Sequence, residues 1–145
     1  MTEPRVRPAT QADHERLREL TFESKAHWGY DHELVRSWAA TLDFAREIWV
    51  AELGGEIVAW AALRPPDDGV CELDDLWVEP AAIGTGIGTA LFRHAADRAR
   101  AAGAHALRWE AEPNAVGFYE RMGAETVGTA TSEWGRTLPV MQVEL

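Results

Sequence analysis

Apolar residues at helical spacing predict two helices in the first third of the chain. Thr10 offers an N-cap with an acidic residue three positions later, and Leu17 and Leu20 follow, so we predict a helix that ends near Lys25. Asp31 can cap a second helix. We expect this second helix to bury one face, formed by Leu34, Val35, Trp38 and Leu42.

The middle of the chain has the apolar runs and turn residues of β-strands. Residues 48–53 and 57–63 flank Gly54-Gly55, and because glycine adopts the positive backbone angles of a primed turn, we predict a hairpin. A third strand is predicted over residues 70–78. Its alternation breaks at Asp74-Asp75, and a β-bulge is one explanation.

The rest of the chain alternates helices and strands. The strongest helical pattern runs from Gly88 to Ala102, and Gly103 is placed to end that helix. Its apolar stripe is formed by Leu91, Ala95, Ala99 and Ala102. The remaining predicted elements are a strand over residues 106–111, a short helix over 116–122 and strands over 124–131 and 138–143, with an extended segment at 5–7 near the start of the chain.

Length and charge narrow the class of protein. The chain has 145 residues, 46% of them hydrophobic and 26% charged, which predicts one globular domain over residues 1–145. With 14 basic and 24 acidic residues, it lacks the basic surface that binding to duplex nucleic acid requires. The acidity is local, because residues 41–80 carry a net charge of −8. A cationic partner fits this segment, and a solubilising surface is the alternative.

Cysteine content and hydropathy predict a cytoplasmic protein. The single cysteine, Cys71, cannot form an internal disulfide or a cysteine-based metal site, and its apolar strand context favours a core position. We expect no metal. No apolar run approaches the length of a membrane span, and the start at Met1-Thr2-Glu3-Pro4 lacks an export signal. We therefore expect no association with a membrane.

Residues 80–89, Pro-Ala-Ala-Ile-Gly-Thr-Gly-Ile-Gly-Thr, lie between a predicted strand and the strongest predicted helix. Glycines there leave backbone N–H groups uncovered at the positive end of a helix, which suits a phosphate anion. A Rossmann fingerprint would need a glycine where Thr89 stands, and a P-loop would need a Gly-Lys-Ser/Thr sequence, which is absent. A tight connection without a ligand would also use these glycines.

Several segments in order resemble the GCN5-related N-acetyltransferase (GNAT) superfamily, in its small single-domain bacterial form. They are Leu73 to Pro80, the glycine loop, the helix after it and Pro113 to Ala124. The resemblance implies an α/β (α+β) fold, with a mixed, mostly antiparallel, V-shaped sheet of about six to seven strands and about four helices. It also implies transfer of the acetyl group of acetyl-CoA to a primary amine, by direct attack in a ternary complex.

The family's loop pattern, Gln/Arg-x-x-Gly-x-Gly/Ala, maps its first position onto Ile83 and its glycines onto Gly86 and Gly88. Ile83 departs from the pattern, but a cradle of backbone N–H groups for the pyrophosphate remains. The resemblance implies that the loop binds the cofactor through Ile83, Gly84, Thr85, Gly86, Ile87, Gly88 and Thr89. The hydroxyls of Thr85 and Thr89 could add donors.

By the same analogy, the strands after Val70 and after His105 splay apart, and the pantetheine arm of the cofactor fills the gap. Backbone groups of Leu76, Trp77 and Val78 would pair with its amides. The N–H of Leu76 or of Trp77 would hold the oxyanion that develops on the thioester carbonyl.

Proton transfer needs further residues, because an ammonium group must lose a proton before it can attack. The resemblance implies Glu72 as the leading candidate base, because several members of the family place a catalytic glutamate eleven residues before the position of Ile83. Asp74 and Asp75 compete with it, directly or through a water molecule. Tyr119 matches the family tyrosine that protonates or stabilises the departing thiolate, and packing beside Phe118 is the alternative role. We assign Phe118 and Asn114 to the cofactor arm, although Asn114 precedes the tyrosine by five residues where the family often has seven.

The connection between the first two predicted helices corresponds to the acceptor wall of the family. We expect His27, Trp28 and Tyr30 to contact the acceptor, and core packing is the alternative for Trp28. A cation held over an aromatic ring would also benefit from the acidic segment.

The acceptor is expected to be a small cationic or peptidic amine. The alternatives are a protein N-terminal or lysine acetyltransferase and a non-catalytic acyl-CoA sensor. Homodimers are common in the family, and no residue pattern here demands one.

Overall fold

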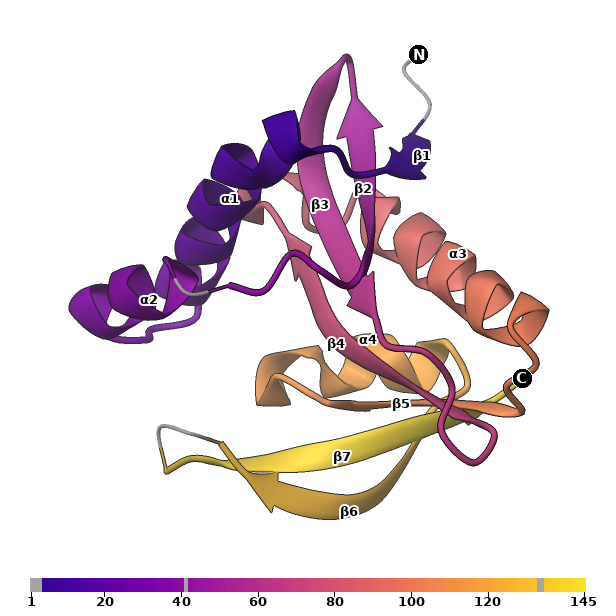
Figure 1. Cartoon of the computed structure of the whole chain (residues 1–145). Helices are drawn as coiled ribbons and strands as arrows, with labels where there is room; N and C mark the ends of the chain where they lie inside the picture. The colour runs from indigo at the N-terminus through magenta and orange to yellow at the C-terminus, as the bar shows by residue number, and fades with distance from the viewer. Residues whose placement is uncertain (1–3, 41, 133–134) are drawn as a thin grey trace. The chain divides into compact units, whose positions relative to one another are not determined.

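The computed structural model describes residues 4–40, 42–132 and 135–145 (Figure 1). Within these residues seven strands form one sheet: β1 (Arg5–Pro8), β2 (Glu47–Leu53), β3 (Glu56–Leu63), β4 (Val70–Val78), β5 (Ala106–Glu110), β6 (Glu125–Thr131) and β7 (Thr137–Glu144). The four α-helices in the same ranges are α1 (His14–His27), α2 (His32–Ala39), α3 (Ile87–Ala101) and α4 (Val116–Arg121). Single 3-10 turns occupy Gln11–Asp13, Pro80–Ala82 and Pro113–Ala115.

The strands are ordered β1-β2-β3-β4-β5-β7-β6. The β1–β2, β5–β7 and β6–β7 pairs are antiparallel, and the β4–β5 pair is parallel. The predicted fold class, a mixed and mostly antiparallel sheet with four helices, is confirmed. The residues Met1, Thr2 and Glu3, on which part of the export-signal prediction rests, lie outside the described ranges. No helix of the described residues has the length and apolar character needed to cross a bilayer.

The chain divides into two compact units. Unit 1 comprises Met1–Ala62 and Asp75–Ala95, and unit 2 comprises Leu63–Asp74 and Ala96–Leu145. The prediction of one domain over residues 1–145 therefore stays a prediction.

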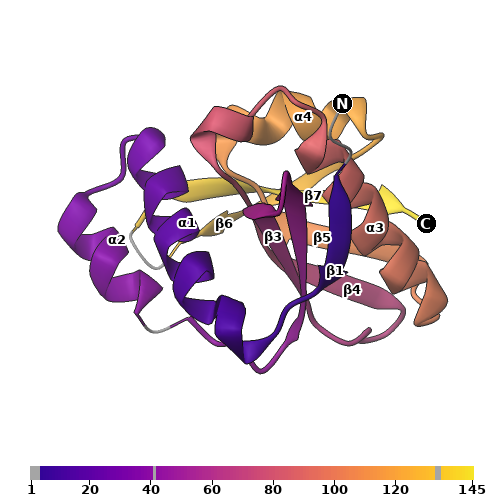
Figure 2. The ribbon, with the colours of Figure 1, turned by 90° about the horizontal axis from the view of Figure 1, so that it is seen from above.

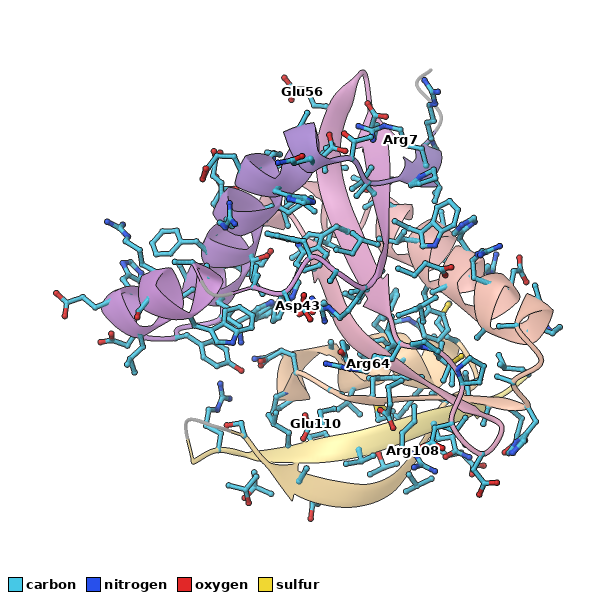
Figure 3. The ribbon with its side chains drawn as sticks, viewed as in Figure 1. Arg7, Asp43, Glu56, Arg64, Arg108 and Glu110 are labelled. Carbon is cyan, nitrogen blue, oxygen red and sulfur yellow. The ribbon has the colours of Figure 1, made fainter. Side chains whose placement is uncertain are left out.

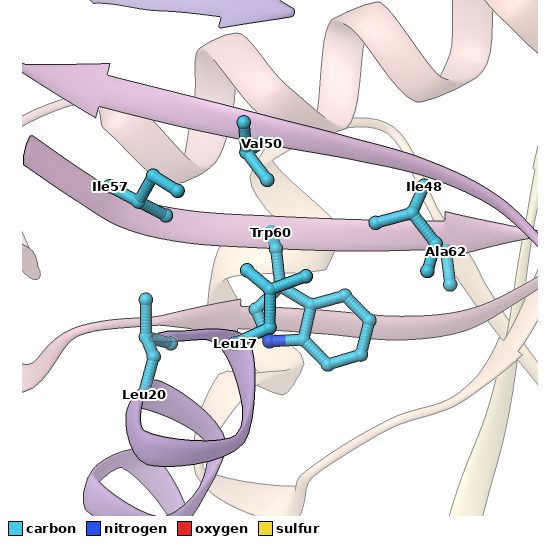
Figure 4. Packing of buried hydrophobic residues seen from close by; sticks show 7 residues of the cluster. All are labelled: Leu17, Leu20, Ile48, Val50, Ile57, Trp60 and Ala62. Atoms are coloured by element: carbon cyan, nitrogen blue, oxygen red, sulfur yellow. The ribbon is translucent and has the colours of Figure 1, made fainter. Parts of the chain in front are cut away.

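The core of unit 1 forms around the indole of Trp60 (Figure 4). Trp60, Leu17 and Leu20 are fully buried, and the cluster also contains Ile48, Val50, Ile57 and Ala62. The indole Nε1–H donates to the hydroxyl of Thr21 over 2.9 Å, and this hydroxyl donates to the Leu17 carbonyl over 2.7 Å. The polar atoms of the buried Trp60 and Thr21 side chains therefore have hydrogen-bond partners within the protein, and these bonds connect α1 to β3.

The two N-terminal helices lie side by side (Figure 2). Helix α2 begins after the predicted cap Asp31, whereas the predicted cap Thr10 begins the 3-10 turn that precedes α1. The Thr10 N–H donates to the Asp13 carboxylate over 2.7 Å, and Asp31 accepts the Leu34 N–H over 3.0 Å. The first helix ends at His27, two residues beyond the predicted position. The prediction that Leu34 is buried is wrong, because it is 54% exposed. The buried side of α2 passes through Val35 and Ala39, and Leu34 lies about 100° around the helix from Val35.

The β2–β3 hairpin turns as predicted, because Gly54 and Gly55 both have positive φ. The helix α3 ends before Gly103, whose φ of +91° provides the predicted stop. The prediction that Ala102 continues the apolar stripe is wrong. The helix ends at Ala101, so Ala102 is exposed and Ala104 takes the next buried position.

Strand β4 has the predicted bounds, but its pattern differs from the prediction at Asp74-Asp75. Its alternation is unbroken there, because Cys71, Leu73 and Asp75 are buried and Asp74 is exposed. The apparent break arises because the inward position is filled by a carboxylate, Asp75, that is paired with Arg46. The bulge that the sequence suggested stays a prediction. The burial of Cys71 confirms its core position.

Candidate functional site

The glycine loop of unit 1 connects the Pro80–Ala82 turn to α3. Buried Ala82 and Ile87 anchor its two ends. Gly84 and Gly86 have φ of +85° and +87°, a backbone conformation that other residues rarely adopt. The first helical hydrogen bond runs from the Ala90 N–H to the Gly86 carbonyl over 3.1 Å. The amides of the first three helical residues, Ile87 to Thr89, therefore have no acceptor within the helix and can bind an anion.

The side chains of the loop contribute less than its backbone does. The Thr85 hydroxyl donates to the Ala82 carbonyl over 2.5 Å, so its one proton is used inside the loop, contrary to the prediction of a free donor. Ile83 is 47% exposed and offers no polar atom at the position where the family has Gln or Arg. Anion binding here would depend on backbone N–H groups and the positive end of α3.

The end of β4 in unit 1 is held by polar contacts. Asp75 is buried; its Oδ2 lies 2.6 Å from Arg46 Nη1, and its Oδ1 accepts from the Trp77 indole over 2.9 Å. The Val78 carbonyl accepts from the Ser24 hydroxyl over 2.8 Å, so one of its lone pairs is already engaged. Leu76 and Trp77 are half-buried. The sequence pattern did not identify Arg46, although a carboxylate at an inward strand position indicates a buried cationic partner.

The predicted acceptor residues of unit 1 lie at the end of α1 and just beyond it. His27 is exposed and packs edge-on against Trp28, with ring centroids 4.7 Å apart. Tyr30 is half-buried, and the ammonium of Lys25 lies 4.5 Å from the centroid of its ring. The structure brings Tyr30 together with Trp77 around Lys25. Trp38 of α2 joins them, and the sequence pattern predicted only a core role for it.

In unit 2, Glu72 lies where the pairing of β4 with β5 ends. The parallel ladder joins Val70 to Ala106, Cys71 to Leu107 and Glu72 to Arg108. Both strands continue, yet no further pair between them is found in the part of the chain that the structure describes. The predicted separation of the two strands beyond these residues stays a prediction.

The Glu72 carboxylate is half-buried, and its pKa is raised above the usual value. Burial is the largest cause, Arg108 opposes it, and the carboxylates of Asp74 and Glu110 add to the rise (Figure 3). Arg108 donates to Gln142 over 2.9 and 3.1 Å. Among the described residues, no hydrogen bond or ion pair of the Glu72 carboxylate is found.

The other carboxylate of unit 2 that was considered as a base is already paired. Asp74 forms an ion pair with Arg64. The sequence pattern did not single out Arg64, which is labelled in Figure 3. Of the three candidate carboxylates, Glu72 is thus the one that forms no ion pair among the described residues.

Tyr119 of α4 is buried, and its ring packs against Trp109 and Phe118 with centroid distances of 4.8 and 5.1 Å. Burial raises the pKa of its phenol well above the usual value, and the charge of Glu112 adds to the rise. Asn114 is exposed, and its amide donates to Glu112 over 2.8 Å. Unit 2 thus holds a protonated phenol within a cluster of aromatic rings.

Comparisons with known proteins give a consistent result. The sequence profile described as the acetyltransferase (GNAT) family matches residues 12–124. A search of curated proteins finds no match.

Three solved structures illustrate the similarity of fold. A GCN5-related N-acetyltransferase from Rhodopseudomonas palustris is 25% identical over 100% of this chain and 98% of its own, with a TM-score of 0.82. A histone acetyltransferase HPA2 and related acetyltransferase from Corynebacterium glutamicum is 26% identical over 98% of this chain and 96% of its own, with a TM-score of 0.74. YncA from Salmonella typhimurium, solved with acetyl-CoA, is 21% identical over 99% of this chain and 94% of its own, with a TM-score of 0.73.

Proposed function

Because this chain belongs to the acetyltransferase (GNAT) family, we propose that it transfers the acetyl group of acetyl-CoA to a primary amine by direct attack in a ternary complex. The acceptor is a small cationic or peptidic amine. The observation that carries the proposal is the glycine loop, where left-handed Gly84 and Gly86 present the first amides of α3 for a pyrophosphate. Solved relatives that contain acetyl-CoA or coenzyme A support this choice of co-substrate.

The loop and the end of β4 would hold the co-substrate, which supplies the activated acetyl group. Because the Ile83 side chain has no polar atom and the Thr85 N–H already donates to the Ala82 carbonyl over 3.2 Å, the backbone N–H groups of Gly84 and of residues 86–89 would carry the phosphate contacts. The N–H of Leu76 or Trp77 donates to the thioester carbonyl. Val78 contributes less through its carbonyl, since Ser24 already donates to it.

Glu72 is the general base of the proposal. Its raised pKa makes it a stronger base than an ordinary carboxylate, and it forms no ion pair with a described residue. Asp74 and Asp75 are each held by an arginine, so a proton transfer to either would have to break an ion pair. We propose that Asp75 positions Trp77, because its carboxylate accepts a hydrogen bond from the Trp77 indole N–H.

Tyr119 serves the leaving sulfur as a hydrogen-bond donor in this proposal. An ordinary phenol with a pKa of about 10 is already a weaker acid than a thiol with a pKa of about 8.5. Burial raises the pKa of Tyr119 further, so full transfer of its proton becomes less favourable. A neutral phenol that donates to the thiolate stabilises charge without losing its proton.

Calorimetry with acetyl-CoA, followed by a thiol-release assay over a panel of amines, tests the proposal. We expect binding and release of coenzyme A with at least one polyamine, aminoglycoside, amino acid or peptide. Peptides with free and blocked α-amines separate a protein N-terminal or lysine acetyltransferase from a small-molecule enzyme. Binding without release on any amine would identify the sensor instead. An absence of heat with every coenzyme A species would contradict the proposal itself.

Variants of two carboxylates test the assignment of the base. Glu72→Gln is expected to lower kcat/KM by about 10²-fold or more, the usual range for a general base. Glu110→Gln is the matched control, because it removes a nearby carboxylate of β5 that only raises the pKa of Glu72. It should keep its activity and move the acidic limb of the pH profile to lower pH. Equal kcat/KM for Glu72→Gln and the unmodified protein across the pH range would show that another group is the base.

We also propose that the protein acts in the cytoplasm, since its one cysteine is buried and it needs no disulfide. A homodimer is a further expectation, which sedimentation velocity tests.

A further inference from the structure

In unit 1, three aromatic rings of the described residues form a cage around the ammonium group of Lys25. Its Nζ is 4.5 Å from the ring centroid of Tyr30, 4.5 Å from that of Trp38 and 4.7 Å from that of Trp77. Trp38 and Trp77 meet edge-on, with centroids 6.3 Å apart. An ammonium over one ring is stabilised by about 0.5–2 kcal/mol, and this group has three rings at contact distance. The cage is therefore a site with the chemistry to bind an alkylammonium.

The residue in the cage is the only lysine of the chain. The other 13 of the 14 basic residues are arginines. Two of these arginines each lie over one aromatic ring. The guanidinium of Arg18 is 5.0 Å from the ring centroid of Phe44, and that of Arg36 is 4.9 Å from the ring centroid of Phe22. A guanidinium is flat and stacks on one ring, whereas an ammonium is compact and can be surrounded. The cage is thus shaped for an ammonium, and the chain supplies one there and nowhere else among its side chains.

Hydrogen bonds of neighbouring residues strengthen the cage and connect it to β4. The Trp77 indole N–H donates to Asp75, and an indole that donates to a carboxylate gains electron density on the face that meets the cation. Asp75 in turn pairs with Arg46 over 2.6 Å, which holds the carboxylate under the indole. The hydroxyl of Ser24 fixes the last turn of α1 to the Val78 carbonyl. The three rings come from the α1–α2 connection, from α2 and from β4.

We propose that the cage of Tyr30, Trp38 and Trp77 binds the alkylammonium group of a cationic acceptor, and that Lys25 occupies it until the acceptor displaces it. A lysine side chain is suited to this exchange, because its stem is flexible and its ammonium is strongly hydrated once released. The description of the bound cation as an acceptor rests on the proposed function, while ammonium binding by the cage does not.

The test replaces the resident cation and adds one from solution. Lys25→Ala empties the cage, and titration with tetramethylammonium or n-butylammonium is followed by tryptophan fluorescence and calorimetry. We expect Lys25→Ala to bind both cations and the unmodified protein to bind them about tenfold more weakly or worse, because Lys25 competes in cis. Uncharged tert-butanol should not bind. Adding Trp38→Leu, which keeps an apolar side chain but removes a ring, should abolish binding by Lys25→Ala.

Two further variants keep the test decisive. Arg36→Ala removes a cation over a single ring of the same helix pair and should bind ammonium no better than the unmodified protein. Lys25→Gln keeps side-chain length without charge, so it should bind tetramethylammonium even if Lys25→Ala does not fold. Failure of both Lys25 variants to bind, or binding that survives Trp38→Leu, would overturn the inference. Because this readout needs no acetyl-CoA, ammonium binding without coenzyme A release refutes the proposed function alone, and release without ammonium binding refutes the cage alone.

Discussion

The bridge that Arg7 makes between Asp13 and Glu52 gives a stability prediction with a defined magnitude. The guanidinium contacts Asp13 over 2.8 and 3.1 Å and Glu52 over 2.6 Å, and the Asp13 side chain is 11% exposed. The Arg7 hydrogen bonds are the largest cause that lowers the pKa of Asp13, from 3.8 to about 2. At about 1.4 kcal/mol for each unit, this shift corresponds to about 2 kcal/mol of folding free energy.

The sign of the effect follows from the lowered pKa. The unfolded chain binds a proton at Asp13 below a pH of about 3.8, whereas the folded chain does so only near a pH of about 2. The stabilisation is therefore complete above the higher value and is lost as the pH falls toward the lower one. Asp13→Asn should cost about 2 kcal/mol at neutral pH, and its difference from the unmodified protein should shrink as the pH falls below about 4.

Urea unfolding followed by circular dichroism, repeated from neutral pH to a pH of about 3, measures both quantities. Glu15→Gln is the control, because Glu15 pairs with Arg18 at 3.9 Å on an 83% exposed side chain and such surface pairs contribute about 0–1 kcal/mol. If Asp13→Asn costs no more than Glu15→Gln, or if its cost does not depend on pH, the Arg7 bridge does not stabilise the fold as reasoned here.

Three further variants probe the core, the loop and the base. Thr21→Val should destabilise the fold by about 1–3 kcal/mol in urea unfolding, because it leaves the buried Trp60 N–H without its acceptor, whereas Thr21→Ser should keep that bond and cost less. Gly86→Ala should cost about 1–2 kcal/mol through its positive φ alone, since no atom lies within 4 Å of the added Cβ, and calorimetry should show weaker acetyl-CoA binding; unchanged affinity would separate the loop from the cofactor. Glu72→Gln should raise the Tm at neutral pH while it lowers activity. Burial of the charged carboxylate raises the pKa of Glu72 and costs folding free energy, and an uncharged amide avoids that cost. An unchanged or lower Tm would contradict burial as the origin of the pKa shift.

Local chemistry made much of the fold predictable. The Gly54-Gly55 turn, the Asp31 cap and the Gly103 stop each depend on backbone preferences that a few adjacent residues determine. Leu34 and Ala102 were mispredicted because helical spacing identifies an apolar stripe, but not where the helix ends or which edge of the stripe meets a neighbour. Those outcomes depend on packing between distant segments.

The site was predictable in its motifs and not in its ion pairs. The glycine loop was evident from its residues, and Glu72 was identified through the resemblance. The pairing of Asp75 with Arg46, the pairing of Asp74 with Arg64 and the contact of Lys25 with Trp77 each join residues 10 or more positions apart, which no local pattern encodes. These contacts are what distinguish three neighbouring carboxylates from one another.

The short parallel ladder between β4 and β5 has a consequence for the order of folding. Its three rungs join residues 36 positions apart, such as Val70 and Ala106, whereas the β6–β7 hairpin closes between Thr131 and Thr137. Closing the longer loop costs more chain entropy and gains few hydrogen bonds in return. The rung that carries Glu72 is therefore expected to form after the hairpins and to open before them under mild denaturation, so that catalysis would fail before most of the sheet has melted.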